Sequence, residues 1–170
     1  MDRPRTLAAL TAIAALLAFT GCGDDDDDEG SAGSSTTETQ LAEPEVDLDK
    51  KPKIEVPEDT APAGLQIDDI VTGDGATARA GDMVKVHYVG VAYSTGEEFD
   101  SSWDRGEPFS FQLGAGQVIP GWDEGVAGMQ VGGRRELTIP PDLAYGEQGS
   151  PPAIGPNETL IFVVDLLDVG

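Results

Sequence analysis

The 170-residue chain is poor in cysteine, histidine and basic side chains. Its single cysteine, Cys22, excludes an intramolecular disulfide, so the fold must be held by its core alone. Lys and Arg number 10 against 32 Asp and Glu, which gives a formal net charge of -22. This shortage of cations argues against a nucleic-acid partner, because phosphate binding needs clustered Lys and Arg, and against adsorption to anionic lipid.

Apolar runs are short. The run from Leu7 to Phe19 follows Arg3 and Arg5 and falls below the roughly 20 residues needed to cross a bilayer, so residues 1–22 are predicted to be an export signal. Small residues precede Cys22 and resemble a bacterial lipobox, with Phe19 where that pattern usually has Leu. We therefore expect an exported protein held on the outer face of the cell membrane by a lipid on Cys22 alone. The alternative is an ordinary signal peptide with an incidental cysteine.

Residues 23–63 have little apolar content and no helical or strand period. They begin with an acidic run from Asp24 to Glu29 and later contain four prolines, Pro44, Pro52, Pro57 and Pro62. Such a segment cannot bury enough apolar surface to offset the entropy of ordering, so we predict a disordered tether that its prolines stiffen. A solvated spacer is favoured over a calcium site, because the acidic run lacks the spacing and glycine of an EF-hand loop.

The remaining 107 residues, 64–170, show mainly strand patterns. Val84, Val86 and Tyr88 alternate with Lys85 and His87 in the clearest example. The only histidine, His87, is thereby expected on the outer surface, without partners for a triad or a metal site. Glycine (22) and proline (12) are frequent, which disfavours a helix-rich fold. Strands are predicted at 65–71, 83–91, 98–101, 109–112, 134–139 and 159–169.

One segment, residues 119–126, has a helical pattern instead. Pro120 suits the first turn of a helix, and acidic residues follow it where they favour the helix N-terminus. Ile119, Trp122, Val126 and Met129 recur at helical spacing and would form one apolar face. A single short helix packed on an antiparallel sheet gives an α+β fold.

Five sequence blocks together resemble the FKBP-type peptidyl-prolyl cis–trans isomerases across residues 64–170. These blocks are Val86-His87-Tyr88-Val89-Gly90, Phe99-Asp100-Ser101-Ser102, Val118-Ile119-Pro120-Gly121-Trp122-Asp123-Glu124-Gly125, Ile139-Pro140-Pro141-Asp142-Leu143-Ala144-Tyr145-Gly146 and Leu160-Ile161-Phe162. The resemblance implies an antiparallel sheet of five or six strands curled around one short helix. It also implies isomerisation of Xaa-Pro bonds with neither metal nor cofactor.

Aromatic side chains from six separate segments are the candidate site. From the residues alone they would be assigned to the core, but the resemblance implies that they line a pocket for the prolyl ring. Implied catalytic residues are Tyr88, Asp100, Trp122 and Tyr145. Implied substrate-binding residues are Phe99, Arg105, Phe109, Val118, Ile119, Ile154 and Phe162. The Tyr145 hydroxyl and the Ile119 N–H would donate to the substrate, and Asp100 would lie at the rim near Tyr88 and Arg105. An ordinary surface ion pair is the alternative for Asp100 and Arg105.

The resemblance also predicts partners. Proline-containing polypeptides, in particular exported proteins that are folding, are the expected substrates, and macrolides are possible inhibitors of a monomeric protein. A catalytically weak proline-binding or chaperone module of the same fold is the competing hypothesis. Ser150 stands where many family members carry His, so the contacts of that loop are open. Trp103 either extends the apolar surface near Asp100 or is a plain exposed side chain.

Overall fold

The computed structural model describes residues 47–170. The expected signal peptide, Cys22 and the first part of the expected tether lie outside the described residues. Among the helices formed by residues 47–170, none is both long and apolar enough to span a membrane.

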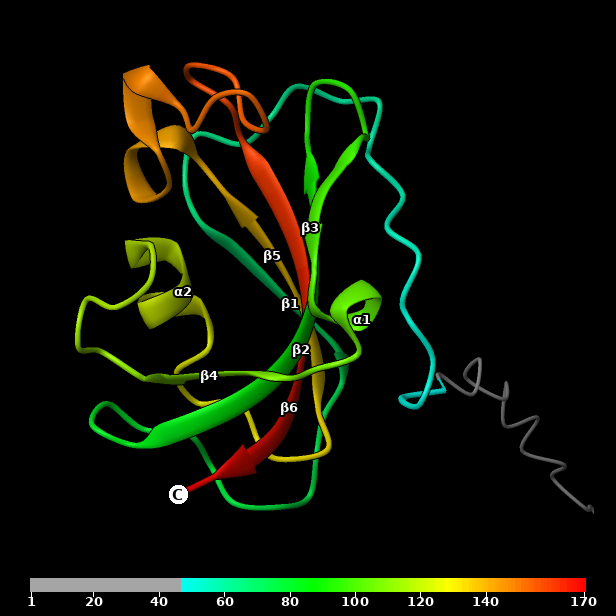
Figure 1. The fold of residues 1–170 in the computed structure, drawn as a ribbon, viewed down its shortest axis with the longest axis vertical. Coiled ribbons are helices and arrows are strands. Elements are labelled where there is room, and N and C mark those ends of the chain that lie inside the picture. The colour runs from blue at the N-terminus through cyan, green and yellow to red at the C-terminus, as the bar shows by residue number, and fades with distance from the viewer. Residues whose placement is uncertain (1–46) are drawn as a thin grey trace, which may run out of the picture. The chain divides into compact units, whose positions relative to one another are not determined.

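Six antiparallel strands form one strongly curved sheet (Figure 1). In the order β1-β5-β6-β2-β3, the two longest strands, β2 and β6, lie at the centre, and β4 pairs with the first half of β2. All six strands predicted from the sequence are confirmed to within one residue at each end. Their bounds are Gln66–Val71 (β1), Met83–Ala92 (β2), Glu98–Ser101 (β3), Phe109–Gln112 (β4), Arg134–Ile139 (β5) and Leu160–Val169 (β6).

The predicted helix is present as α2, Pro120–Gly125, with Ile119 as its N-cap. It lies on the concave face of the sheet, hereafter the inner face (Figure 1). Trp122, Val126 and Met129 are at most 3% exposed, which confirms their burial. Close packing on β5 depends on glycine, since a Cβ at Gly121 would lie 2.4 Å from a methyl group of Ile139.

Three further helical turns were not predicted. They are α1 (Ser102–Arg105) and two 3₁₀ turns, η1 (Pro141–Leu143) and η2 (Gly146–Gln148). Each is three or four residues long, too short for a periodic apolar pattern to reveal it. The turn α1 follows β3 directly and ends at Gly106, which has the left-handed backbone conformation (φ 67°) common at helix ends.

The central strands are buried on both faces of the sheet. The inner face packs against α2 in the main core, whereas Val89, Val91 and Ile161 form a second cluster on the opposite, outer face. Strands buried on both faces are nearly continuous in apolar residues, as Leu160–Val164 of β6 is. The outer face therefore needs a cover of its own.

That cover is the segment 47–59, which we call the strap. It runs along the outside of β3 and α1, on the side of the sheet away from α2 (cyan in Figure 1). Ile54 and Val56 pack against the outer-face cluster, and the Asp59 carbonyl accepts a hydrogen bond from the Tyr93 hydroxyl (3.2 Å). The sequence placed residues 47–59 in a disordered tether. The structure differs because two alternating apolar side chains suffice when a hydrophobic surface is already formed by the sheet.

A buried ion pair lies at the beginning of the strap. The side chains of Arg134 and Asp165 are only 5% and 3% exposed, and Arg134 Nη2 lies 2.8 Å from Asp165 Oδ2. Arg134 also donates to the backbone carbonyl of Lys50 at 3.0 Å, so the same guanidinium anchors the strap. Burial raises the pKa of Asp165 although its bonds to Arg134 act in the opposite direction.

His87 and Trp103 also lie on the outer face. Their rings are stacked with centroids 4.3 Å apart, and His87 Nδ1 lies 2.9 Å from the Ser102 hydroxyl. His87 does point away from the inner face as predicted, but it is half-buried under Trp103 rather than free on the surface. Trp103 belongs to the outer-face cluster, so neither of the two roles considered from the sequence describes it.

Candidate active site

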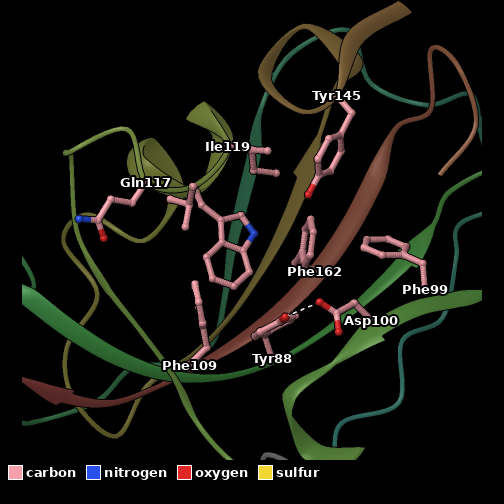
Figure 2. A pocket seen from close by; sticks show the side chains of 10 residues that line it. Tyr88, Phe99, Asp100, Phe109, Gln117, Ile119, Tyr145 and Phe162 are labelled. Atoms are coloured by element: carbon pink, nitrogen blue, oxygen red, sulfur yellow. Dashed lines mark hydrogen bonds between the residues drawn. The ribbon is translucent and has the colours of Figure 1, made fainter. Parts of the chain in front are cut away.

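A cavity of about 210 Å³ opens on the inner face between α2, the centre of the sheet and the loop around Tyr145 (Figure 2). This is below the about 300–1,000 Å³ of pockets for drug-sized ligands and suits a small cyclic group. The structure brings together nine residues that the sequence assigned to one site, together with Gln117. The lining residues are Tyr88, Phe99, Asp100, Phe109, Gln117, Val118, Ile119, Trp122, Tyr145 and Phe162.

Trp122 is the centre of the aromatic cluster. Its ring meets those of Tyr88 and Phe162 edge to face, with centroids 5.0 Å and 5.3 Å away and interplanar angles of 85° and 88°. Phe109 contacts it in the same manner at 6.2 Å. Edge-to-face contacts of this kind add about 0.5–1.5 kcal/mol each beyond the area that they bury. The rings therefore form a continuous apolar wall around Trp122.

The strand β2 contributes a glycine to this wall. A Cβ at Gly90 would lie 2.7 Å from the rings of both Phe99 and Phe162, whose centroids are 5.5 Å apart. Only glycine lets the two rings pack this closely over the strand. The position of Phe99 at the cavity thus depends on a residue without a side chain.

One edge of the cavity is polar. The Asp100 carboxylate accepts hydrogen bonds from the Tyr88 hydroxyl (dashed in Figure 2) and from Arg105, and Arg105 Nη2 lies 2.9 Å from the Tyr88 oxygen. These three side chains close a ring of hydrogen bonds, where the resemblance implied only that Asp100 lies near Tyr88 and Arg105. Burial and the bond to Asp100 raise the pKa of Tyr88 to about 12, so its hydroxyl stays protonated at neutral pH. Arg105 forms part of the rim and does not line the cavity.

Tyr145 and Ile119 lie across the cavity from this ring. Figure 2 shows the Tyr145 hydroxyl directed into the cavity, with the Ile119 side chain beside it. Tyr145 is 42% exposed, which leaves its hydroxyl accessible. Burial of the phenol and the charge of Asp100 raise the pKa of Tyr145, so it too is a donor at neutral pH.

The position of α2 is fixed from both ends. The Asp123 carboxylate accepts the backbone N–H groups of Gly114 and Gly116 at 2.8 Å and 3.0 Å, which ties the preceding loop to the helix. At the other end, Arg135 donates to the Gly125 carbonyl at 2.8 Å and so satisfies an acceptor that a helix end leaves free. Arg135 in turn pairs with Asp69 of β1. Trp122 is therefore held at the cavity by contacts that lie outside it.

Besides Arg105, two residues differ from the sequence prediction. Ile154, expected to bind substrate, is 4% exposed and packs in the main core instead of lining the cavity. Its backbone pairs with Ser150 in an isolated β-bridge, which holds the loop closed and the side chain inward. Gln117, which was not predicted, lines the cavity while its Oε1 accepts the backbone N–H of Gln112 at 3.1 Å. An exposed polar loop residue gives no sequence signal beyond its place next to Val118.

Within the part of the chain that the structure describes, no group of three or more His, Cys, Asp or Glu residues could hold a metal ion. The groups that face the cavity are rings, aliphatic side chains, hydroxyls, one amide and one carboxylate. They can enclose an apolar ring, donate hydrogen bonds and orient a backbone.

Comparisons of the sequence and of the structure with known proteins point to the same family. The family model for FKBP-type peptidyl-prolyl cis–trans isomerases matches residues 75–167. An FK506-binding protein of Streptomyces anulatus is 63% identical over 121 residues, which cover 71% of this chain and 98% of the relative. A probable FK506-binding protein of Corynebacterium glutamicum is 55% identical over 118 residues, covering 69% of this chain and 98% of that relative. The crystal structure of AtFKBP13 superposes with a TM-score of 0.59 at 40% identity, covering 65% of this chain and 96% of that one. The chain belongs to the FKBP-type peptidyl-prolyl cis–trans isomerases, enzymes that accelerate rotation about Xaa-Pro bonds.

Proposed function

We propose that the inner-face cavity receives the prolyl ring and binds the Xaa-Pro amide most tightly when it is twisted. Resonance gives the planar amide a rotation barrier of about 18–20 kcal/mol, and both planar states of an Xaa-Pro bond are slow to exchange. Twisting breaks this resonance and reduces the charge separation of the amide. A dry cavity walled by aromatic rings favours that less polar state, so it stabilises the transition state more than either planar state. The observation that carries this proposal is the set of edge-to-face rings around Trp122.

Polar groups at two edges of the cavity would fix the position and orientation of the substrate backbone. The Tyr145 hydroxyl and the Ile119 N–H would donate to substrate carbonyls on one side. On the other side, Asp100 would face the substrate backbone while Tyr88 and Arg105 keep its carboxylate in one orientation. None of these groups has to form a covalent bond. They act by orientation and by electrostatic stabilisation.

The test is a prolyl isomerisation assay with the full chain and a short Xaa-Pro peptide, followed by exchange spectroscopy or protease coupling. We expect acceleration far above the uncatalysed rate and about a tenfold fall in kcat/KM for Asp100→Val, since misplaced groups cost catalysis steeply. Asp168→Val removes an exposed carboxylate at the end of β6 and serves as the matched control. Full activity of folded Asp100→Val would refute the assignment of the rim, and no acceleration at all would favour a proline-binding module.

The relatives are named FK506-binding proteins, which suggests a second ligand class for the same cavity. We propose that macrolides compete with Xaa-Pro peptides here. Titration with FK506 in the isomerisation assay tests this, with Trp122→Leu as the variant that should lose inhibition. Isomerisation unaffected by saturating macrolide would contradict it.

We further propose that the protein is exported and attached to the outer face of the membrane by a lipid on Cys22, where it acts as a monomer on proteins that are folding after export. The apolar run and the small residues before Cys22 support this proposal. Cys22→Ser should move the protein from the membrane fraction to the soluble fraction without changing isomerase activity. Unchanged membrane association of this variant would rule out the lipid anchor.

A further inference from the structure

The strap and the active site meet at one place, the connection from β3 to α1. Ile54 and Val56 of the strap pack in the same outer-face cluster as Trp103, which belongs to α1. Val56 also approaches the β2–β3 turn, since a Cβ at Gly96 would lie 3.6 Å from its methyl group. The strap therefore contacts the hairpin that carries Asp100 at both its turn and its base.

Lys51 is the one strap residue that makes polar side-chain contacts to this connection. Its Nζ lies 2.9 Å from Glu98 Oε1 and 2.8 Å from both carboxylate oxygens of Asp104. The pKa of Lys51 is raised: burial acts against its charge, but the hydrogen bonds to Asp104 and Glu98 outweigh this effect. The bond to Lys51 lowers the pKa of Asp104. One ammonium thus joins two carboxylates, one from β3 and one from α1.

Each of these two carboxylates lies close in the sequence to a residue of the polar edge of the cavity. Glu98 stands two residues before Asp100 in β3, and Asp104 immediately precedes Arg105 in α1. The Asp100–Arg105 pair is exposed, at 42% and 47% for the two side chains, and a single exposed pair holds its geometry weakly. Lys51 is also 35% exposed, but it binds two carboxylates at once, and a network of charges holds its geometry better than an isolated pair. The turn α1 is only four residues long and its N-cap makes no side-chain hydrogen bond. The buried Ser102 hydroxyl ties the start of α1 to the Tyr88 backbone of β2, so it is the Asp104–Arg105 end of the turn that depends on further contacts.

At least one relative has a counterpart of the strap in its sequence. The match to the Streptomyces protein spans 121 residues of this chain, so it must begin at or before residue 50 even if it runs to residue 170. That match covers 98% of the relative, whose chain therefore has a counterpart of most of the strap. The strap is better understood as part of the enzyme than as the end of a spacer.

We propose that Lys51 is a positioning residue for the isomerase site. By joining Glu98 to Asp104 it fixes the angle between β3 and α1, and this angle sets how Asp100 and Arg105 meet the Tyr88 hydroxyl. Loss of the ammonium frees the Asp104–Arg105 end of α1 and weakens the orientation of Asp100 without changing the aromatic walls. This inference rests on the rim proposed above, and it assigns the strap a part in catalysis that the tether does not have.

The experiment compares Lys51→Met with wild type in the full chain. Methionine keeps most of the side-chain length and removes the charge, so we expect kcat to fall about fivefold with KM nearly unchanged, because misplaced catalytic groups slow turnover more than binding. Lys51→Arg should restore at least half of the wild-type kcat. Lys53→Met is the matched control, since Lys53 pairs only with the exposed Glu55 two residues away. A wild-type kcat in Lys51→Met would overturn the inference, as would equal losses in the Met and Arg variants.

A double-mutant cycle with Asp100→Val separates positioning from a general loss of stability. If Lys51 acts through Asp100, Lys51→Met should lower kcat by less than twofold in the Asp100→Val background. A fivefold loss that persists in this background would overturn the inference. If Asp100→Val alone leaves kcat unchanged, the proposed rim fails. If Asp100→Val lowers kcat and Lys51→Met does not, only the role of Lys51 fails.

Discussion

The inner and outer faces of the sheet are both apolar, but the chain covers only the outer face fully. On the outer face Val89, Val91 and Ile161 are at most 5% exposed, because the strap lies over them. On the inner face α2 covers part of the sheet and leaves a cavity, at which Phe109 and Tyr145 remain 36% and 42% exposed. Exposed apolar surface that is hollowed and rimmed by polar groups is available to a ligand, whereas covered surface serves stability.

Two neighbouring residues of β2 show the same contrast. His87 points outward, where its ring stacks on Trp103 and its Nδ1 contacts the Ser102 hydroxyl. Tyr88 points inward to the cavity, where its hydroxyl takes part in the ring with Asp100 and Arg105. Apart from Lys51, whose proposed effect reaches the cavity through Asp100, a change on the outer face should therefore act mainly on stability, and a change on the inner face mainly on catalysis. The following predictions test this division.

The largest effect on stability is expected for Arg134→Ala on the outer face. It leaves the buried Asp165 carboxylate without its partner and removes the anchor of the strap at Lys50. Breaking a buried pair in this way costs about 3–5 kcal/mol of unfolding free energy. The loss should shrink at low pH, because burial already raises the pKa of Asp165 and protonation removes the unpaired charge.

Urea unfolding between pH 5 and 8 measures this loss. The matched control is Lys85→Ala, which breaks an exposed pair with Asp168 at 3.9 Å and should cost about 0–1 kcal/mol. A loss for Arg134→Ala no larger than that of the control would mean that the outer face does not depend on its ion pair.

On the inner face, Trp122→Leu should lower kcat/KM by at least about tenfold, equivalent to about 1.4 kcal/mol of transition-state stabilisation. Trp122 is also 3% exposed, so the variant should lose about 2 kcal/mol of stability and must be assayed where it is folded. Phe111→Leu is the control: this ring is 1% exposed and packs on Trp122 with centroids 5.6 Å apart, but it does not line the cavity. Similar losses of activity in both variants would show that the core, and not the cavity wall, limits turnover.

The inner face could be predicted well from the sequence, for two reasons. Alternation in strands such as β2 fixes which side chains share a face, and the spacing of Trp122, Val126 and Met129 fixes the buried side of α2. The family resemblance then implied that rings from separate segments meet in one cavity. It did not predict Gln117 at the wall or Ile154 in the core. The positions of these loop side chains depend on local hydrogen bonds, which leave no periodic pattern in the sequence.

The cover of the outer face was not predicted, and the physical reason lies in the strap. Ile54 and Val56 are separated by the charged Glu55 and flanked by prolines, a composition typical of disordered segments. The informative signal was in β6, whose apolar run from Leu160 to Val164 exceeds what a sheet with one solvated face needs. Such a run predicts that both faces of the sheet are covered, but it does not indicate which segment covers the outer face. The burial of Arg134 with Asp165 has no sequence signal either, since the two residues are paired only by the register of β5 and β6.

The smallest effect concerns the Tyr88 hydroxyl at the polar edge of the cavity. Burial and the bond to Asp100 raise the pKa of Tyr88 from 10.0 to about 12, so the folded protein holds this proton longer than the unfolded chain does. The stability that results is complete below about pH 10 and is lost as pH rises from about 10 toward 12. The difference in unfolding free energy between wild type and Tyr88→Phe should therefore change between pH 9 and 11, with wild type losing more stability because it alone has this phenol to ionise. Parallel curves would mean that the Tyr88 hydroxyl is open to water, and the division between a dry cavity wall and its exposed rim would have to be drawn elsewhere.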